Sequence, residues 1–428
     1  MNDSCDVVQR AAKVFTPALH LYYPISVVRG EGVSVYAADG RSWLDFSSGL
    51  AVLAVGHNHP RVVAAAQKQL ENLIHTGGVY FNETTVAAAE KLVSITPPGL
   101  DRLFFSNSGA EAVEGALKVA RYVTGRQGIL SFTRAFHGRT LGALSVTTSS
   151  SAYRKRYHPL LPSVYQTPYP YCFRCPFRQE PDSCGLCCLQ DLKETLKHRI
   201  PGDEIAAIII EPFLGEGGYF PAPPAFLVAL RELCDHYGIL LIFDEVQSGM
   251  GRTGRWFASE ISAVVPDIMT VAKGIASGFP LSAVVARKEI MEQWPSGAHG
   301  TTFGGNPVSC AACSATIDVI RDESLLEKTT LRGDMILERL QRLAKSHPVI
   351  GQVRGHGFMI GIEFVLPDHA PDPGSCEEVI SYCLKHGLIL INCGIDRNVI
   401  RFIPPLTTTD RELDNALTIF EEGVQRLG

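Results

Sequence analysis

The chain has 428 residues, 46% of them hydrophobic, and a formal net charge of -5. This length provides for two or three domains with a large core. The slightly acidic balance gives no basic surface for nucleic acid or an anionic membrane. No run reaches the roughly 18 apolar residues of a spanning helix, and the first residues contain no long apolar core. These features predict a cytoplasmic protein.

The first 75 residues predict a hairpin, a loop and a helix. Residues 30–45 alternate around a turn at Asp39 and Gly40, which is typical of a hairpin. Residues 46–60 contain several Gly and Pro residues and predict a loop. Helical spacing of apolar residues follows over 61–75.

A helix N-terminus is indicated after a short strand over residues 103–107. Ser108 and Glu111 form an S-x-x-E capping box, and the helix extends to about Thr124. The simplest interpretation is a well-capped helix. The same geometry also makes an anion site from the Ser108 hydroxyl and the backbone amides of Gly109 and Ala110.

Two unalternating apolar runs each end in a charged residue. Residues 239–243 stop at Asp244 and Glu245, and residues 268–272 stop at Lys273. Such runs indicate parallel strands that are covered on both faces. In open α/β sheets ligands bind beyond the carboxyl ends of the strands, so the acid and the lysine should face one crevice.

This pair suits pyridoxal 5'-phosphate (PLP) chemistry, in which a lysine amine forms a Schiff base and a carboxylate keeps the pyridine nitrogen protonated. The ordinary alternative is a strand-end lysine in solvent, because lysine is seldom buried. Apolar neighbours of Lys273 would desolvate its amine and lower its pKa, and Gly274 leaves room beside the backbone.

A G-x-G-x-x-G pattern at Gly249, Gly251 and Gly254 suggests a dinucleotide-binding fingerprint, but the signal is weak. Four residues separate Asp244 from Gly249, and the residues that follow would make a poor first helical turn. A glycine-rich loop is expected instead.

The segments DEVQSGMGRTG (244–254) and TVAKGIASGFPLSA (270–283) resemble the signature of class III aminotransferases of PLP fold type I. The match runs from about Gly30 to the C-terminus. It implies an α/β fold with a mostly parallel central sheet in a large domain, and a smaller α/β domain formed by the N- and C-terminal segments. The expected limits are 1–58 for the N-terminal segment, 59–308 for the large domain and 309–428 for the C-terminal part.

The resemblance also implies PLP as cofactor and a role for each matching residue. Lys273 would bind the cofactor covalently and shuttle a proton, and Asp244 would pair with the pyridine nitrogen. The NSGAEA and FHGRT motifs would hold the phosphate and stack on the ring, and Thr302 would reach the phosphate of a neighbouring subunit. The implied cofactor-binding residues are Ser108, Gly109, Ala110, Phe136, Asp244, Val246, Gln247, Lys273 and Thr302.

Two arginines and a glutamate are expected to select the substrate. Arg401 lies in an apolar run, where an arginine is costly to bury without an anion, although strand alternation could point it to solvent. The resemblance pairs Arg401 with Glu216, a residue between glycines, and assigns Arg139 to the distal carboxylate of an ω-amino acid. It also places Leu50 against the substrate, which counts against free ornithine as the donor.

The resemblance implies a reaction that moves the terminal amino group of an ω-amino acid to 2-oxoglutarate and gives a semialdehyde and glutamate. The expected donor is 4-aminobutyrate. An acetylornithine-type aminotransferase shares nearly all these residues, and an amino-acid racemase or epimerase on the same scaffold is the second alternative. The shared phosphate site implies a homodimer or a dimer of dimers.

A cysteine-rich insertion over residues 169–189 departs from the family pattern. Its paired C-x2-C spacing could bind zinc through Cys172, Cys175, Cys184 and Cys187, with Cys188 adjacent. Reduced thiols are the favoured interpretation, zinc comes second, and a disulfide is the least expected in a reducing compartment. Transamination needs no metal, so zinc here would stabilise a loop or an interface.

Overall fold

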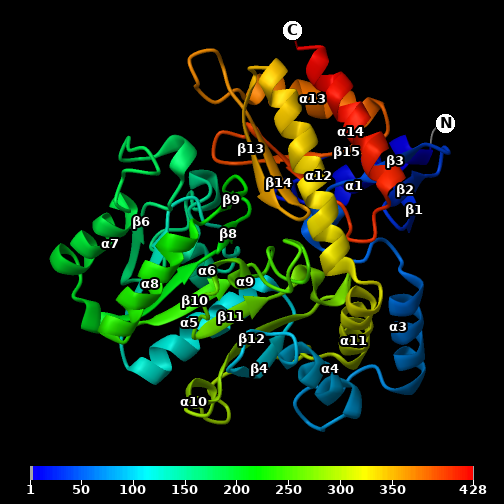
Figure 1. Ribbon diagram of the computed structural model, residues 1–428. Helices are drawn as coiled ribbons and strands as arrows, with labels where there is room; N and C mark the ends of the chain where they lie inside the picture. The colour runs from blue at the N-terminus through cyan, green and yellow to red at the C-terminus, as the bar shows by residue number, and fades with distance from the viewer. Residues whose placement is uncertain (1–2, 428) are drawn as a thin grey trace.

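The computed structural model describes residues 3–427 and is built around a seven-stranded sheet (Figure 1). All its strands run parallel except β12, which is antiparallel to both neighbours. In spatial order they are β4 (Leu100–Ser106), β12 (Ser282–Arg287), β11 (Ile268–Val271), β10 (Leu240–Asp244), β7 (Ile205–Ile210), β5 (Gly128–Phe132) and β6 (Val164–Thr167).

The central strands are covered on both faces, as their unalternating apolar sequences predict. Every residue of β5 and β7 is buried. Along β10, Ile242 packs into one core with helix α5 (Gly109–Thr124). Its neighbours Leu241 and Phe243 pack into the opposite core with α8 (Pro224–Tyr237). Because the sheet is buried on both sides, only the ends of its strands are open to a ligand.

The N- and C-terminal segments share a second sheet at one end of the molecule, in the order β1 (Val27–Glu31), β2 (Ser34–Ala37), β3 (Ser42–Asp45) and β15 (Leu388–Ile389). The β2–β3 pairing, with Val35 opposite Trp43, confirms the predicted hairpin. Residues Leu44 and Asp45 pair in parallel with β15. The fold class predicted from the sequence is therefore confirmed, with a smaller α/β domain built from both ends of the chain.

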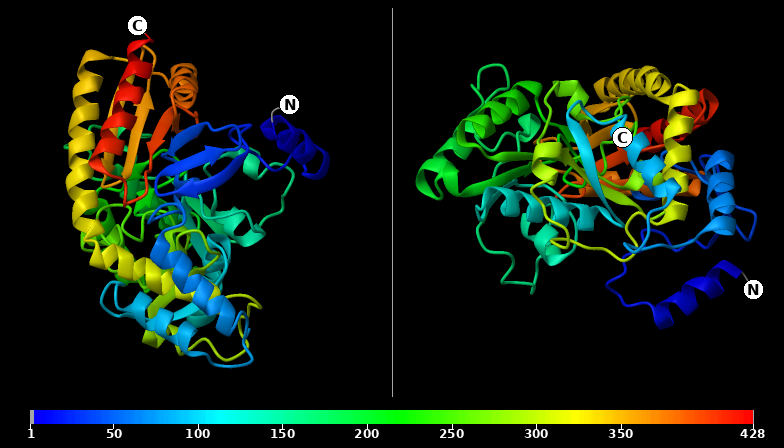
Figure 2. Two further views of the ribbon diagram at one scale, coloured as in Figure 1. Left: turned by 90° about the vertical axis from the view of Figure 1, so that its right-hand side faces the viewer. Right: turned by 90° about the horizontal axis from the view of Figure 1, so that it is seen from below.

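A third sheet completes the smaller domain, in the order β13 (Ile350–His356), β14 (Met359–Phe364), β17 (Val399–Phe402) and β16 (Ile391–Cys393). Figure 2 shows this sheet stacked with α12 (Leu325–Ser346), α13 (Pro373–Lys385) and α14 (Asp410–Gln425), while α1 (Asp3–Val14) lies at the margin. Two short strands, β8 (Phe213–Leu214) and β9 (Phe220–Pro221), form a separate hairpin.

The remaining elements are short or lie around the large sheet. The helices are α2 (Ser48–Ala51), α3 (Pro60–Asn72), α4 (Glu83–Val93), α6 (Leu141–Val146), α7 (Cys187–His198), α9 (Ser259–Ser262), α10 (Lys288–Met291) and α11 (Pro307–Asp322). The 3-10 turns are η1 (Ser151–Tyr153), η2 (Cys172–Arg174), η3 (Gly202–Glu204) and η4 (Lys273–Ala276). Across residues 3–427 no helix combines the length and apolar character needed to cross a membrane.

Residues 388–393 form two short strands in different sheets, because β15 pairs with β3 and β16 pairs with β17. The glycine-rich segment 249–254 is a loop, as predicted. Gly251 and Gly254 have positive φ, and the next helix, α9, has only four residues. It therefore lacks the strand-to-helix context of a dinucleotide-binding fingerprint.

Candidate active site

Asp244 and Lys273 lie at the carboxyl edge of the large sheet, as predicted. Asp244 is the last residue of β10 and pairs in register with Thr270 of β11, and Lys273 follows the end of β11. Both side chains line a cavity of about 440 Å³. Parallel pairing of these strands brings an acid and an amine from positions 29 residues apart to one crevice.

Asp244 is held by three hydrogen bonds in a buried position. Its Oδ2 lies 2.7 Å from Nδ1 of buried His137. Its Oδ1 accepts from Thr270 Oγ1 at 3.1 Å and from the Val246 amide at 3.0 Å. These partners fix the carboxylate in one orientation, which is the requirement for a group that holds a ring nitrogen protonated.

Lys273 has the environment that an imine-forming amine needs. Protein atoms around it disfavour the charged form and lower its pKa, although Asp244 and Glu211 act in the opposite sense. The residue has a φ of 48°, in the left-handed region, where the chain turns sharply from β11 into η4. A lowered pKa increases the fraction of neutral amine, the nucleophilic and basic form.

The N-terminus of α5 reaches the same cavity through Ser108, Gly109 and Ala110. The Ser108 side chain accepts from the Glu111 amide and Glu111 accepts from the Ser108 amide, so the predicted capping box is present. Amides in the first helical turn have no carbonyl partner within the helix and are oriented toward an anion. A Cβ on Gly109 would come within 2.9 Å of Val246, so the site tolerates only glycine there without a shift.

Phe136, Val246 and Gln247 also line the cavity. The Gln247 Oε1 accepts a 2.6 Å hydrogen bond from the Tyr219 hydroxyl. This bond fixes the amide so that its Nε2 is the atom available to donate to a ligand. The donor set, the aromatic face and the anion site together fit a flat, phosphorylated pyridine such as PLP.

Three of the expected substrate residues, Arg139, Glu216 and Arg401, belong to one connected group. Arg401 is almost fully buried, and its Nη1 lies 3.2 Å from Glu216 Oε2. Arg139 lines the cavity, and its guanidinium carbon lies 3.4 Å from the centroid of the Tyr153 ring. The Tyr153 hydroxyl donates to Glu216 Oε1 at 3.3 Å, so this tyrosine bridges the two anion anchors.

Four predicted residues do not line this cavity within the single chain, namely Leu50, Glu216, Thr302 and Arg401. Leu50 is 46% exposed and does not line it, although Val52 does. Thr302 is exposed and lies beside Gly77, whose Cβ would come within 3.6 Å of the Thr302 carbonyl oxygen. The resemblance assigns Thr302 to the phosphate site of a neighbouring subunit, and that assignment stays a prediction.

Sequence reasoning missed three residues, namely Glu211, Tyr153 and Tyr219. Glu211 is buried and accepts from the amides of Phe136 at 2.9 Å and Gly215 at 2.8 Å. Burial raises its pKa to about 7, and Asp244 adds to the rise. The only sequence signal was its place at the end of the β7 strand. Nothing in the sequence marked the two tyrosines, since Tyr153 lies in a short 3-10 turn and Tyr219 in the loop between β8 and β9.

The cysteine-rich insertion does not form a metal centre in residues 3–427. Cys172, Cys175, Cys184, Cys187 and Cys188 line one cavity of about 20 Å³ as free thiols. No three metal-ligating side chains of the described part are arranged to hold an ion. The zinc hypothesis gains no support from this geometry.

Comparisons with known proteins agree with this site. A family model described as "Aminotransferase class-III" matches residues 17–424. A probable 4-aminobutyrate aminotransferase of Bacillus subtilis is 39% identical, covering 93% of this chain and 92% of that protein. An acetylornithine aminotransferase of Methanocaldococcus jannaschii is 42% identical, covering 93% of each.

An alanine/serine racemase of Pyrococcus horikoshii is 39% identical and covers 98% of this chain and 90% of that protein. Among solved structures, an amine transaminase from an uncultivated Pseudomonas species in its PLP-bound form has a TM-score of 0.89 and 31% identity, covering 97% and 99% of the two chains. The chain belongs to the class III aminotransferase family and is a PLP-dependent transaminase.

Proposed function

We propose that this transaminase moves the terminal amino group of an ω-amino acid, 4-aminobutyrate first among them, to 2-oxoglutarate. The proposal rests on one observation, namely that within the described part of the chain only one of the two arginines is paired with a carboxylate. Arg139 lines the cavity and has no carboxylate partner among residues 3–427, whereas Arg401 is covered by Glu216 at 3.2 Å. One open cationic anchor suits a donor with a single carboxylate far from its amine.

PLP, when bound, supplies the electron sink that stabilises negative charge at the substrate carbon. The α5 N-terminus and Ser108 would hold its phosphate, Phe136 and Val246 would contact its ring, and Gln247 would approach its phenolic oxygen. Asp244 would hold the proton on the ring nitrogen. Lys273, whose amine pKa is lowered by burial, would take up the proton that leaves the substrate carbon and pass it on.

The second substrate requires the second arginine. A dicarboxylate such as 2-oxoglutarate would anchor one carboxylate on Arg139 and the other on Arg401 once Glu216 moves aside. The Glu216 side chain keeps 24% exposure, which leaves it room to leave a guanidinium that is only 3% exposed. One pocket can then accept two substrates of different shape.

We also propose that the chain forms a homodimer with shared active sites. Large apolar side chains are exposed at Val79, Tyr80, Phe81 and Phe303, and Phe81 is fully exposed. The His75 and Phe303 rings lie 5.3 Å apart, so the two segments form one surface. An exposed apolar patch of this kind favours a second copy as its cover, and Thr302 lies on it.

The test follows the visible absorbance of the bound cofactor during each half-reaction. Addition of 4-aminobutyrate without a keto acid should change the absorbance, and 2-oxoglutarate should restore it. A change with N-acetylornithine but not with 4-aminobutyrate would favour an acetylornithine-type donor. If no amine changes the spectrum while an L-amino acid loses optical activity, the enzyme is a racemase like its relative in Pyrococcus horikoshii.

A further inference from the structure

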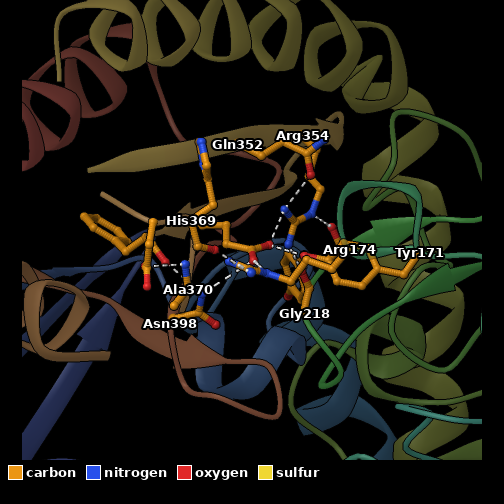
Figure 3. A network of polar contacts seen from close by, with 12 residues as sticks. Tyr171, Arg174, Gly218, Gln352, Arg354, His369, Ala370 and Asn398 are labelled. Atoms are coloured by element: carbon orange, nitrogen blue, oxygen red, sulfur yellow. Dashed lines mark hydrogen bonds and ion pairs between the residues drawn. The ribbon is translucent and has the colours of Figure 1, made fainter. Parts of the chain in front are cut away.

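A buried network of charged groups joins the cysteine-rich insertion to the smaller domain (Figure 3). At its centre, the Glu363 carboxylate on β14 accepts from the Tyr171 hydroxyl at 2.5 Å and from Arg174 Nε at 2.6 Å. Arg354 on β13 approaches the same carboxylate at 2.8 Å. Tyr171 and Arg174 flank Cys172 and belong to the insertion, which the catalytic mechanism does not otherwise use.

Arg354 extends the network toward the active site. Its Nε donates to the Tyr219 carbonyl at 2.9 Å, and its Nη2 donates to the Gly218 carbonyl at 2.6 Å. Its guanidinium also lies 3.9 Å from the centroid of the Phe220 ring, on which Tyr171 stacks at 3.6 Å. The segment from Gly218 to Phe220 is therefore held through its backbone carbonyls and through the Phe220 ring.

The held segment follows directly after Glu216. Glu216 forms the ion pair with Arg401, and Tyr219 hydrogen-bonds Gln247 in the cavity wall. Gly218 and Tyr219 both donate their amides to the Gly215 carbonyl, which closes a tight turn around Glu216. A shift of the Gly218 and Tyr219 carbonyls would thus move the carboxylate that covers Arg401.

Joining two domains through buried charged groups carries a large desolvation penalty. The side chains of Arg354 and Glu363 are 8% and 2% exposed, and Arg174 is 22% exposed. Buried charged groups contribute little net stability unless their geometry is well fixed. Apolar residues could fill the same space with a smaller desolvation penalty. A role in fixing geometry accounts for charged groups at this place.

We propose that Tyr171, Arg174, Glu363 and Arg354 are positioning residues that hold Glu216 against Arg401, so that the cysteine-rich insertion sets the carboxylate preference of the site. The inference rests on the proposed function of the Glu216 and Arg401 pair. A dicarboxylate must displace Glu216, and its apparent affinity falls with the fraction of molecules in which Arg401 is covered. Weakening the network lowers that fraction and strengthens dicarboxylate binding.

The test measures binding of glutarate, a dicarboxylate without a reactive carbonyl, to the PLP-loaded enzyme by titration calorimetry. Tyr171→Phe and Arg174→Gln should each bind glutarate about 3–10-fold more tightly than the wild type, the effect of weakening one hydrogen bond. Arg178→Gln is the matched control, because Arg178 is exposed in the same insertion and makes no ion pair within residues 3–427. It should leave glutarate binding unchanged.

A double-variant comparison separates positioning from general damage. In a Glu216→Gln background Arg401 is already uncovered, so adding Tyr171→Phe should produce no further change. Unchanged or weaker glutarate binding in the single variants, or an undiminished effect in the Glu216→Gln background, would overturn the inference. Tyr171→Phe keeps the stacked ring, so it remains informative if Arg174→Gln does not fold. Glutarate binding needs no turnover, so a failure of the proposed ω-amino acid reaction would show separately in the half-reaction spectra.

Discussion

Glu216 and Arg401 form an ion pair at 3.2 Å in which the arginine is buried and the glutamate is partly exposed. The backbone of Arg401 lies in β17, between β14 and β16, and its guanidinium donates to the Asn392 carbonyl from Nε at 3.1 Å and from Nη2 at 2.7 Å. These contacts hold the arginine in place, whereas the exposed part of Glu216 leaves that side chain freer to move. Glu216 therefore shields a cation that is held in place, and Glu216 itself lies in a loop of the active site.

Removal of the Glu216 charge should affect the two half-reactions unequally. We expect Glu216→Gln to lower kcat/KM for 4-aminobutyrate by about 10-fold or more, since an uncovered Arg401 competes with Arg139 for the single carboxylate of the donor. The half-reaction with glutamate should change less than about threefold. Stopped-flow absorbance of each half-reaction measures both values. Equal losses in the two would contradict the switch.

Lys273 should be indispensable for proton transfer. Lys273→Ala is expected to lower the rate of cofactor conversion by at least about 10²–10⁴-fold, the usual contribution of a positioned acid-base group. Borohydride reduction followed by mass spectrometry should attach the cofactor to the wild-type chain at Lys273 and not to the variant. Lys193→Ala, at an exposed lysine of α7, is the control and should behave as the wild type. Attachment at another lysine would contradict the assignment.

Tyr153 should determine how well carboxylates bind. Its ring covers Arg139 and its hydroxyl donates to Glu216, so two substitutions separate the two contacts. Tyr153→Leu removes both and should raise KM for the donor about 2–30-fold, the range of a cation–π contact. Tyr153→Phe keeps the ring and should raise it less than about threefold. Tyr157→Phe, at an exposed tyrosine nearby, should have no effect on KM in the same assay.

Glu245 should make stability depend on pH, although it lies beside the catalytic Asp244. It is buried and accepts from the amides of Ala258 at 3.0 Å and Ser259 at 2.7 Å. Burial, which outweighs these hydrogen bonds, raises its pKa from 4.5 to about 7. Because the folded state binds this proton more tightly than the unfolded chain, its stabilising effect is complete below pH 4.5 and is lost as pH rises through 7.

The measurement compares the wild type with Glu245→Gln, which cannot titrate. The free energy of unfolding of the wild type, relative to the variant, should fall by about 3 kcal/mol between pH 4.5 and pH 8. Urea denaturation at several pH values gives this difference, and all other titrating groups cancel. A constant difference across the range would show that Glu245 keeps an ordinary pKa in the folded protein.

Local sequence was sufficient for the main buried strands and for the start of the helix beside the cavity. Unalternating apolar runs specified the buried strands that lead to Asp244 and Lys273, because a strand covered on both faces has no polar face to alternate. The capping box at Ser108 specified where α5 begins, since its two hydrogen bonds are made within four residues. Motifs of this kind depend on interactions between residues close in sequence, so the local sequence is enough to predict them.

Contacts between distant segments were decided by the tertiary structure alone. Tyr153 meets Arg139 and Glu216, and Arg174 meets Glu363 across 189 residues. The spacing of the insertion's cysteines suggested a metal, yet the fold gathers their thiols without a metal-holding arrangement within residues 3–427. The physical reason is common to all three cases. Which side chains share a buried space depends on how the sheets and loops pack, and no local pattern records that packing.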